Sequence, residues 1–197
     1  MNNVSVIIID PQKGFCSSSG SLALEYGSDE LERIDKAISN ILVSVSGFIR
    51  CHLVTSEYAP AQFTHGNLDH KLANLCVPNT SEDCEIIDGL RDKDFYSISI
   101  KNQQSALSSE SFKIAIDKDI KEGIKRFIIC GFLLEHCVKR TAEDLKEYVA
   151  RQNAEVIVCS DLSATRVEKY ENGIVDSVYS ALADLGIKTK QWSEIQS

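Results

Sequence analysis

The chain has 197 residues, of which 43% are hydrophobic and 25% are charged, and its formal net charge is -8. This length supports one substantial hydrophobic core, so we expect a single domain over residues 1–197. Proteins that bind nucleic acids neutralise phosphates with clustered basic side chains. The acidic balance and the lack of a Lys/Arg-rich stretch therefore argue against that class.

The cysteines predict a reducing environment. There are seven, an odd number, with no Cys-x-x-Cys spacing, and several lie within apolar runs such as 127–130 and 156–159. This pattern is typical of buried free thiols rather than of a disulfide framework or a zinc site. The apolar run at 4–9 has no signal-peptide features around it and is shorter than a membrane span. We therefore expect a soluble, cytoplasmic protein.

Short β-branched runs alternate with longer amphipathic segments. The runs that predict strands are 4–10, 48–55, 95–101, 126–131, 155–161 and, more weakly, 187–190. Apolar residues at helical spacing predict helices over 29–45, with Ser28 as N-cap, and around 112–124, 138–149 and 174–185. Continuous apolar strands that alternate with helices are typical of a parallel sheet covered on both faces. We predict a three-layer α/β/α sandwich with a Rossmann-like open sheet of about six parallel strands.

Three chemically active side chains fall where such a sheet binds ligands, at the carboxyl ends of its strands. Asp10 ends the first predicted strand, Lys101 ends a later one, and Cys137 follows the strand at 126–131. A thiol near a helix start and an ammonium would have a lowered pKa, and a carboxylate could accept its proton. Each residue also has a plainer interpretation, since Cys137 could be a packing residue, Asp10 a turn cap and Lys101 a solvated charge.

Several motifs occur in order along nearly the whole chain. They are an apolar strand that ends in Asp-x-Gln and reaches Phe (8–16), a Lys followed by Ser-Ala-Leu (Lys101 and 105–107), a segment with Gly six residues before Cys and Thr-Ala after it (131–144), and a late Asp-Leu-Ser-Ala (161–164). Together they resemble the motifs of isochorismatase-like cysteine hydrolases, the family that includes the nicotinamidases. Leu107 stands where the family usually has Phe.

The resemblance implies a cysteine-dependent amidohydrolase that cleaves a small carboxamide or ureido C–N bond through a thioester. Asp10 would take the proton of Cys137, and Lys101 would hold the thiolate. The family also implies a cis peptide bond at Leu133–Leu134 and an oxyanion hole made by the backbone N–H groups of Leu134 and Cys137. It implies no cofactor, a small-molecule substrate and a homo-oligomer, either a dimer or a tetramer. From the charge and the short apolar run we expect no nucleic acid or membrane partner.

The sequence departs from nicotinamidases at their metal ligands. The segment 57–59, Glu-Tyr-Ala, stands where an Asp-x-His pair is expected. His65 keeps the spacing of a further ligand, but Leu75 replaces another. Glu57 and His65 alone are a poor set for zinc, manganese or iron, so we expect no metal.

Four residues are candidates for substrate contact: Phe15, Tyr58, Leu133 and His136. The aromatic rings could stack on a planar group, Leu133 would make the pocket apolar, and His136 could form a hydrogen bond. Each could equally be a packing or helix-start residue. Three other functions stay open: a metal-assisted nicotinamidase with altered ligands, a catalytically silent member that binds a metabolite or a partner, and a flavodoxin-like cofactor binder. The last of these lacks a phosphate-binding glycine loop after the first strand.

Overall fold

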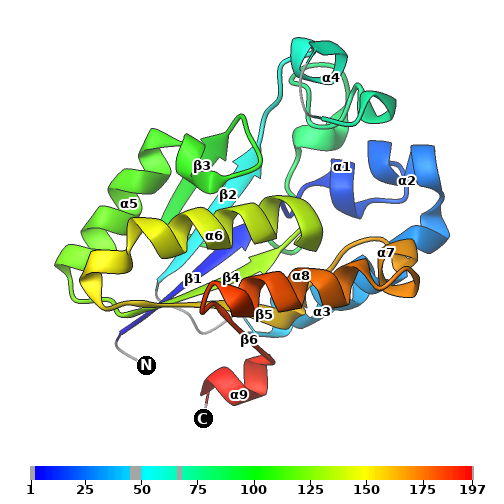
Figure 1. Cartoon of the computed structure of the whole chain (residues 1–197). Helices are drawn as coiled ribbons and strands as arrows, with labels where there is room; N and C mark the ends of the chain where they lie inside the picture. Colours follow the sequence, from blue (N-terminus) through cyan, green and yellow to red (C-terminus); the bar gives the residue numbers. More distant parts are fainter. Residues whose placement is uncertain (1–2, 45–49, 66–67, 197) are drawn as a thin grey trace.

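The structure is a computed structural model that describes residues 3–44, 50–65 and 68–196. One parallel sheet runs through it in the strand order β3-β2-β1-β4-β5-β6 (Figure 1). The strands are β1 (Val4–Ile9), β2 (Cys51–Ser56), β3 (Ser97–Lys101), β4 (Arg126–Gly131), β5 (Glu155–Ser163) and β6 (Lys188–Lys190). The predicted open parallel sheet is confirmed, although the predicted start of the second strand at 48–49 lies outside the described residues.

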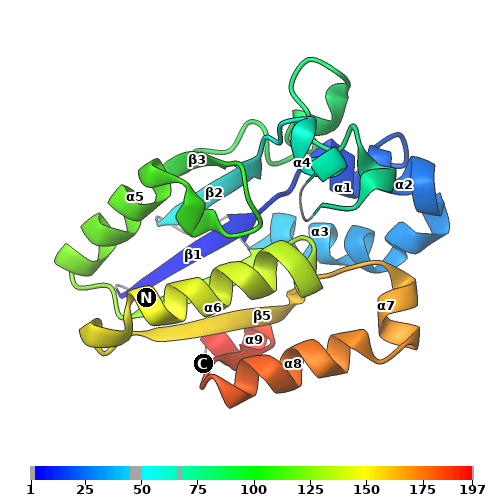
Figure 2. The same ribbon diagram turned by 45° about the horizontal axis from the view of Figure 1, so that its top comes forward.

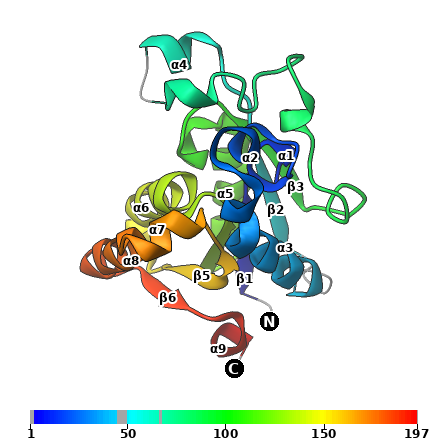
Figure 3. The ribbon, with the colours of Figure 1, turned by 90° about the vertical axis from the view of Figure 1, so that its right-hand side faces the viewer.

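Helices form a layer on each face of the sheet (Figures 2 and 3). One layer contains α5 (Glu110–Lys121), α6 (Lys139–Tyr148) and α8 (Ile174–Asp184), and the other contains α3 (Glu32–Ser44) and α9 (Trp192–Gln196). Shorter helices lie toward the carboxyl ends of the strands; they are α1 (Lys13–Cys16), α2 (Ser21–Tyr26), α4 (Ala61–His65) and α7 (Val167–Glu171). The predicted α/β/α sandwich is therefore confirmed.

The burial of β1 explains why its sequence is apolar at almost every position. Val6 and Ile8 belong to the core on the α3 side, whereas Ile7 and Ile9 belong to the core beneath α5, α6 and α8. All four side chains are fully buried. Because successive strand residues point to opposite faces, a strand covered on both sides needs apolar residues without alternation. Each such side chain contributes roughly 1.5–3 kcal/mol of burial free energy.

The edge strand β3 differs from β1. Ile98 and Ile100 are 58% and 52% exposed, whereas Ser99 and Lys101, on the opposite face of the strand, are buried. The period of two therefore gives β3 one covered face and one open face. Lys101, at the end of this strand, points into the protein.

The helix predicted at 29–45 needs one correction. The chain first forms a 3-10 turn, Ser28–Leu31, and α3 begins only at Glu32. Gly27, with φ of 104°, precedes the turn, and its carbonyl accepts the Glu30 N–H at 3.3 Å. Gly27 rather than Ser28 is therefore the capping residue, because the positive φ that starts this turn suits glycine. Val45, the predicted end of the helix, lies outside the described residues.

The segment between β2 and β3 packs as a cover over the carboxyl ends of the strands. It contains α4 and 3-10 turns at His70–Leu72 and Glu82–Cys84. The Gln12 side chain ties the end of β2 to the turn at Glu82–Cys84, because its Nε2 donates to the Ser56 carbonyl at 3.0 Å and to the Cys84 carbonyl at 3.1 Å. In the part of the chain that the structure describes, no helix has the length and apolarity to cross a membrane.

A buried polar cluster ties β2 to α5 at the amino end of the sheet. His52 Nε2 lies 2.9 Å from Asp119 Oδ2, and Arg50 donates to Asp119 Oδ1 at 2.6 Å. His52 Nδ1 lies 2.7 Å from the Ser97 hydroxyl. Burial alone would raise the pKa of Asp119, but the hydrogen bonds from His52 and Arg50 lower it below its usual value.

We expect Asp119→Asn to lower the free energy of unfolding by about 1–3 kcal/mol, because it removes the charge and leaves buried donors poorly satisfied. The stabilisation by a carboxyl with a lowered pKa is present above its unfolded pKa of about 3.9 and is lost as the pH falls through the folded value. Urea unfolding of both proteins from neutral to acidic pH should show a difference that shrinks in acid. The exposed Asp184→Asn is the control, and an equal effect there would contradict the assignment.

Candidate active site

The strand order changes direction between β1 and β4, and the candidate residues gather at that switch point. Asp10 follows β1 directly and has a φ of 51°. Gly131 ends β4, and a Cβ on it would lie 2.1 Å from the Ile9 carbonyl oxygen. Only glycine permits this approach, which lets the Phe132 N–H donate to Ile9 at 2.9 Å. The turns after the two strands are thereby brought together, as expected for a ligand site in an open α/β sheet.

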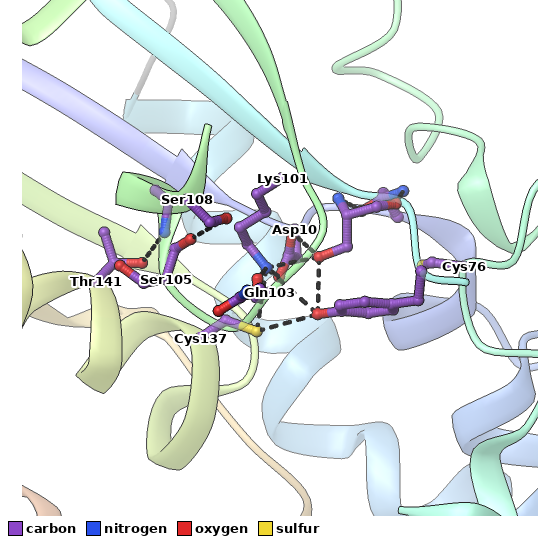
Figure 4. Close-up of polar contacts among 12 residues, drawn as sticks. Asp10, Cys76, Lys101, Gln103, Ser105, Ser108, Cys137 and Thr141 are labelled. Carbon is purple, nitrogen blue, oxygen red and sulfur yellow. Dashed lines mark hydrogen bonds and ion pairs between the residues drawn. The ribbon is translucent and has the colours of Figure 1, made fainter. Parts of the chain in front are cut away.

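The structure brings Asp10, Lys101 and Cys137 together (Figure 4). Lys101 Nζ lies 2.9 Å from Asp10 Oδ2 and 3.3 Å from Cys137 Sγ. It also donates to the Gln103 carbonyl at 3.0 Å. The Asp10 and Lys101 side chains are fully buried, and Cys137 is 3% exposed. A buried ammonium therefore bridges a carboxylate and a thiol.

Two hydroxyl groups that sequence reasoning did not assign to this cluster complete it. The Ser56 hydroxyl donates to Asp10 Oδ1 at 2.9 Å and accepts from Lys101 Nζ at 2.6 Å. The Tyr58 hydroxyl lies 3.0 Å from Ser56 Oγ, 3.4 Å from Lys101 Nζ and 3.7 Å from Cys137 Sγ. Tyr58, expected to stack on substrate, thus also brings a polar group to the thiol.

The environment keeps the thiol protonated. Burial raises the pKa of Cys137 to about 12, and the Asp10 carboxylate acts in the same direction, while Lys101 opposes both. Burial alone would lower the pKa of Lys101, but the Asp10 carboxylate raises it and keeps the ammonium charged. The expectation of a lowered thiol pKa is therefore wrong for the resting protein. Complete burial of the sulfur outweighs the nearby positive charge.

The chain around Cys137 also differs from expectation. A π-helical turn, Leu134–Val138, carries the cysteine, and α6 begins only after it. The cis peptide bond joins Phe132 to Leu133, one residue earlier than predicted. The Leu134 N–H donates to the Ala164 carbonyl at 3.0 Å, so it is already engaged and does not suit the predicted oxyanion hole. Among the bonds of the described residues outside helices and strands, none uses the Leu133 N–H as donor.

Two other motif residues position the loop after β3. The Ser105 side chain accepts the Leu107 N–H at 3.2 Å and so caps the 3-10 turn Ala106–Ser108. Thr141 on α6 accepts the Ala106 N–H at 3.0 Å. The loop is therefore fixed to the helix that follows Cys137 (Figure 4). These contacts give the Ser-Ala and Thr-Ala pairs a structural role at the site.

A cavity of about 380 Å³ opens above Cys137. The four predicted contact residues all line it, although His136 keeps a half-exposed side chain. The lining residues that were not predicted are Leu22, Tyr26, Phe63, Leu68, Asp69, Leu72, Leu75, Gln104, Glu135, Arg166 and Lys169. Cavities of this size, mostly apolar with a few polar groups, are typical of small-molecule sites.

The positions that correspond to metal ligands do not form a site. Glu57 is partly buried, His65 is exposed at the end of α4, and Leu75 contributes an apolar side chain to the cavity wall. In residues 3–44, 50–65 and 68–196, no three His, Cys, Asp or Glu side chains are grouped so that they could hold a metal ion. The residues present therefore do not fit the metal of nicotinamidases.

Some of the missed residues left a signal in the sequence. Ser56 ends β2 just as Asp10 follows β1, so the carboxyl-end rule points to it as well. Glu135 lies two residues before Cys137 and faces the same cavity. Arg166 and Lys169 follow β5, in a region with no recognisable pattern, and their approach to the cavity depends on the path of the chain after that strand.

The sequence and the fold assign the protein to a class. The model of the isochorismatase domain family matches residues 4–184, so the chain belongs to the isochorismatase family of hydrolases. No curated protein matches the sequence.

Solved structures share the fold along nearly the whole chain. The PnC1 protein of L. infantum, crystallised with nicotinate, is 18% identical, with a TM-score of 0.74 over 98% of this chain and 94% of its own. A nicotinamidase/pyrazinamidase of Acinetobacter baumanii is 17% identical, with a TM-score of 0.69 over 99% of both chains. The YcaC protein of Escherichia coli, described as an octameric hydrolase of unknown specificity, is 18% identical, with a TM-score of 0.59 over 97% of this chain and 76% of its own.

We predict that limiting iodoacetamide near neutral pH modifies Cys84 before Cys137. A hydrogen bond from Cys76 lowers the pKa of Cys84, which is half-buried, whereas the other six thiols are buried. The thiolate is the reacting form, so the lower pKa and the greater access favour Cys84. Mass spectrometry of peptides would give the order of labelling. In the Cys84→Ser control, Cys137 should stay slow; labelling of Cys137 first would contradict the raised pKa.

Proposed function

We propose that the protein is a cysteine-dependent amidohydrolase that cleaves a small carboxamide or ureido C–N bond. The observation that carries the proposal is the contact of Lys101 Nζ with both Asp10 and Cys137. The Lys101 ammonium holds a proton acceptor, Asp10, and a nucleophile, Cys137, close together at the cavity. This arrangement meets the geometric needs of an activated thiol with an adjacent proton acceptor. Membership of the isochorismatase family supports it.

In the first half-reaction, Asp10 takes the proton of the Cys137 thiol as the sulfur attacks the substrate carbonyl. Because the pKa of Cys137 is raised in the resting protein, this transfer would accompany substrate binding rather than precede it. Lys101 stabilises the negative charge as it moves between carboxylate and sulfur. The C–N bond then breaks, the leaving nitrogen takes the proton from Asp10, and a thioester on Cys137 remains.

In the second half-reaction, water attacks the thioester carbonyl while Asp10 accepts a proton from the water. The C–S bond breaks, the acid product leaves, and the proton returns to Cys137. The carbonyl oxygen carries negative charge in both steps and needs donors. We assign that role to the backbone N–H groups of Leu133 and Cys137 rather than of Leu134, because the Leu134 N–H donates to Ala164.

The Ser56 hydroxyl would hold the base in place. It donates to one oxygen of Asp10 while Lys101 lies against the other, so the carboxylate has a fixed orientation. The Tyr58 hydroxyl would stabilise negative charge that develops on the sulfur, because it lies close to both Cys137 Sγ and Lys101 Nζ. Such fixed dipoles cost no reorganisation during the reaction.

For the assembly we keep a homo-oligomer as the proposal, and the octamer described for the structurally similar YcaC protein supports it.

The central test is substitution of each reacting residue. Cys137→Ala, Asp10→Asn and Lys101→Met should each lower kcat/KM for an accepted amide by a factor on the order of 10³ or more, because the three groups act as a unit. Release of ammonia measures the activity, and circular dichroism checks the fold. Cys51→Ala, a buried cysteine at the amino end of β2, is the matched control and should keep its activity. Substantial turnover by Cys137→Ala would rule out the sulfur as nucleophile.

The pH dependence gives a separate test. Because the pKa of Cys137 is raised to about 12, raising the pH from about 7 to about 10 does not ionise the thiol of the resting protein. We therefore expect kcat/KM to be flat over that range. A free thiol ionises near pH 8.5. An ascending limb in that region would show that the thiolate forms before the substrate binds.

A further inference from the structure

Two thiols that the proposed chemistry does not use lie against each other in the segment that covers the strands. Cys76 is fully buried, and Cys84 is half-buried in the 3-10 turn Glu82–Cys84. The Cys76 thiol hydrogen-bonds the Cys84 sulfur. Its Sγ also lies 3.4 Å from the carbonyl oxygen of Asp83, the residue before Cys84. A side-chain contact and a backbone contact therefore both place the Cys76 sulfur beside Cys84.

The surroundings of the two thiols give them different reactivity. Cys84 reaches solvent, and the hydrogen bond from Cys76 lowers its pKa, so its thiolate is readily formed. Burial raises the pKa of Cys76 and keeps that thiol protonated. Cysteines that sense oxidants are accessible, have a low pKa and lie next to a second thiol that resolves the oxidised sulfur. Cys84 has the properties of the reacting thiol, and Cys76 is placed as the resolving one.

The remaining cysteines lack this combination. All five are buried, and burial raises the pKa of each; they are Cys16, Cys51, Cys130, Cys137 and Cys159. The thiolate is the form that peroxides oxidise, so these residues should react slowly. An oxidant that approaches the folded protein therefore meets Cys84 first.

The backbone of the two cysteines contacts residues at the candidate active site. The Tyr58 N–H donates to the Cys76 carbonyl at 2.9 Å, and Gln12 Nε2 donates to the Cys84 carbonyl at 3.1 Å. The Tyr58 hydroxyl in turn lies 3.7 Å from Cys137 Sγ. A covalent bond between the two sulfurs would close the short loop 77–83 at the place where the cover is attached to the site.

We propose that Cys84 and Cys76 form a reversible disulfide when the protein meets a hydroperoxide. The Cys84 thiolate attacks the peroxide, the O–O bond breaks, and the leaving oxygen takes the proton that the thiol released. Cys84 is then a sulfenic acid. The Cys76 sulfur attacks the Cys84 sulfur, the S–O bond breaks, and the hydroxyl leaves as water with the Cys76 proton. Two thiols are oxidised to a disulfide and one peroxide is reduced, and exchange with a small thiol restores the pair. The inference is independent of the proposed hydrolysis.

The test treats the reduced protein, freed of reductant, with a small excess of hydrogen peroxide near neutral pH. Remaining thiols are then blocked with N-ethylmaleimide in denaturant, and mass spectrometry of the peptides maps each cysteine over time. We expect a Cys76–Cys84 linkage that forms about tenfold or more faster than any other thiol is oxidised. Dithiothreitol should restore both thiols. First oxidation at another cysteine, or no oxidation of Cys84 while another thiol reacts, would overturn the inference.

Two variants test the separate roles of the thiols. Cys76→Ser keeps a hydrogen-bond donor but cannot resolve the sulfenic acid, so dimedone should label Cys84 after peroxide treatment. Cys51→Ala, the control for loss of a buried thiol, should form the disulfide at the wild-type rate. In the wild type, sulfinic acid at Cys84 with Cys76 still reduced, or a Cys84–Cys84 bond between two chains, contradicts the pairing. The wild-type map decides the question even if Cys76→Ser does not fold, and circular dichroism checks each variant.

Discussion

The site depends on burial of the Lys101 ammonium between a carboxylate and a thiol. A charge so far from water is costly unless it is paired and hydrogen-bonded. Lys101 meets that need with Asp10, Ser56 and the Gln103 carbonyl, and the Cys137 sulfur completes its surroundings. The strands β1, β2 and β3 are neighbours in the sheet; their register pairs Ser56 with Lys101, and Asp10 follows β1 directly after the Ile9–Val54 pair. The geometry of the site is therefore a direct result of strand pairing.

The same burial sets the resting chemistry. In many cysteine enzymes, a nearby cation stabilises the thiolate, but here complete enclosure of the sulfur outweighs the cation and raises the pKa of Cys137. The proposed nucleophile, Cys137, is therefore held as a neutral thiol in the resting protein. This arrangement protects Cys137 from adventitious oxidation, since the thiolate is the form that oxidises readily.

Much of the fold could be predicted because its signals are local. The apolar run of β1 and the helical spacing in α3, α5, α6 and α8 specify the elements, and the carboxyl-end rule brings Asp10, Lys101 and Cys137 to one edge. Other features depend on geometry that no local pattern encodes. The pKa of Cys137 depends on how completely the cover over the strands excludes water. Whether the buried Glu135 oxygens have a hydrogen-bond partner depends on which donors the fold brings near them. The Leu134 hydrogen bond depends on the path of the chain after β5.

The position of Lys101 on the edge strand has a consequence for the durability of the site. β3 has one sheet neighbour and an open face at Ile98 and Ile100, so it is held less firmly than the central strands. Edge elements with exposed faces open at lower free energy than the core of a domain. Fraying of β3 would withdraw the ammonium, leave Asp10 without its countercharge and disable the site while the other strands stayed paired. Opening of this edge strand would therefore remove the site before the central strands separate.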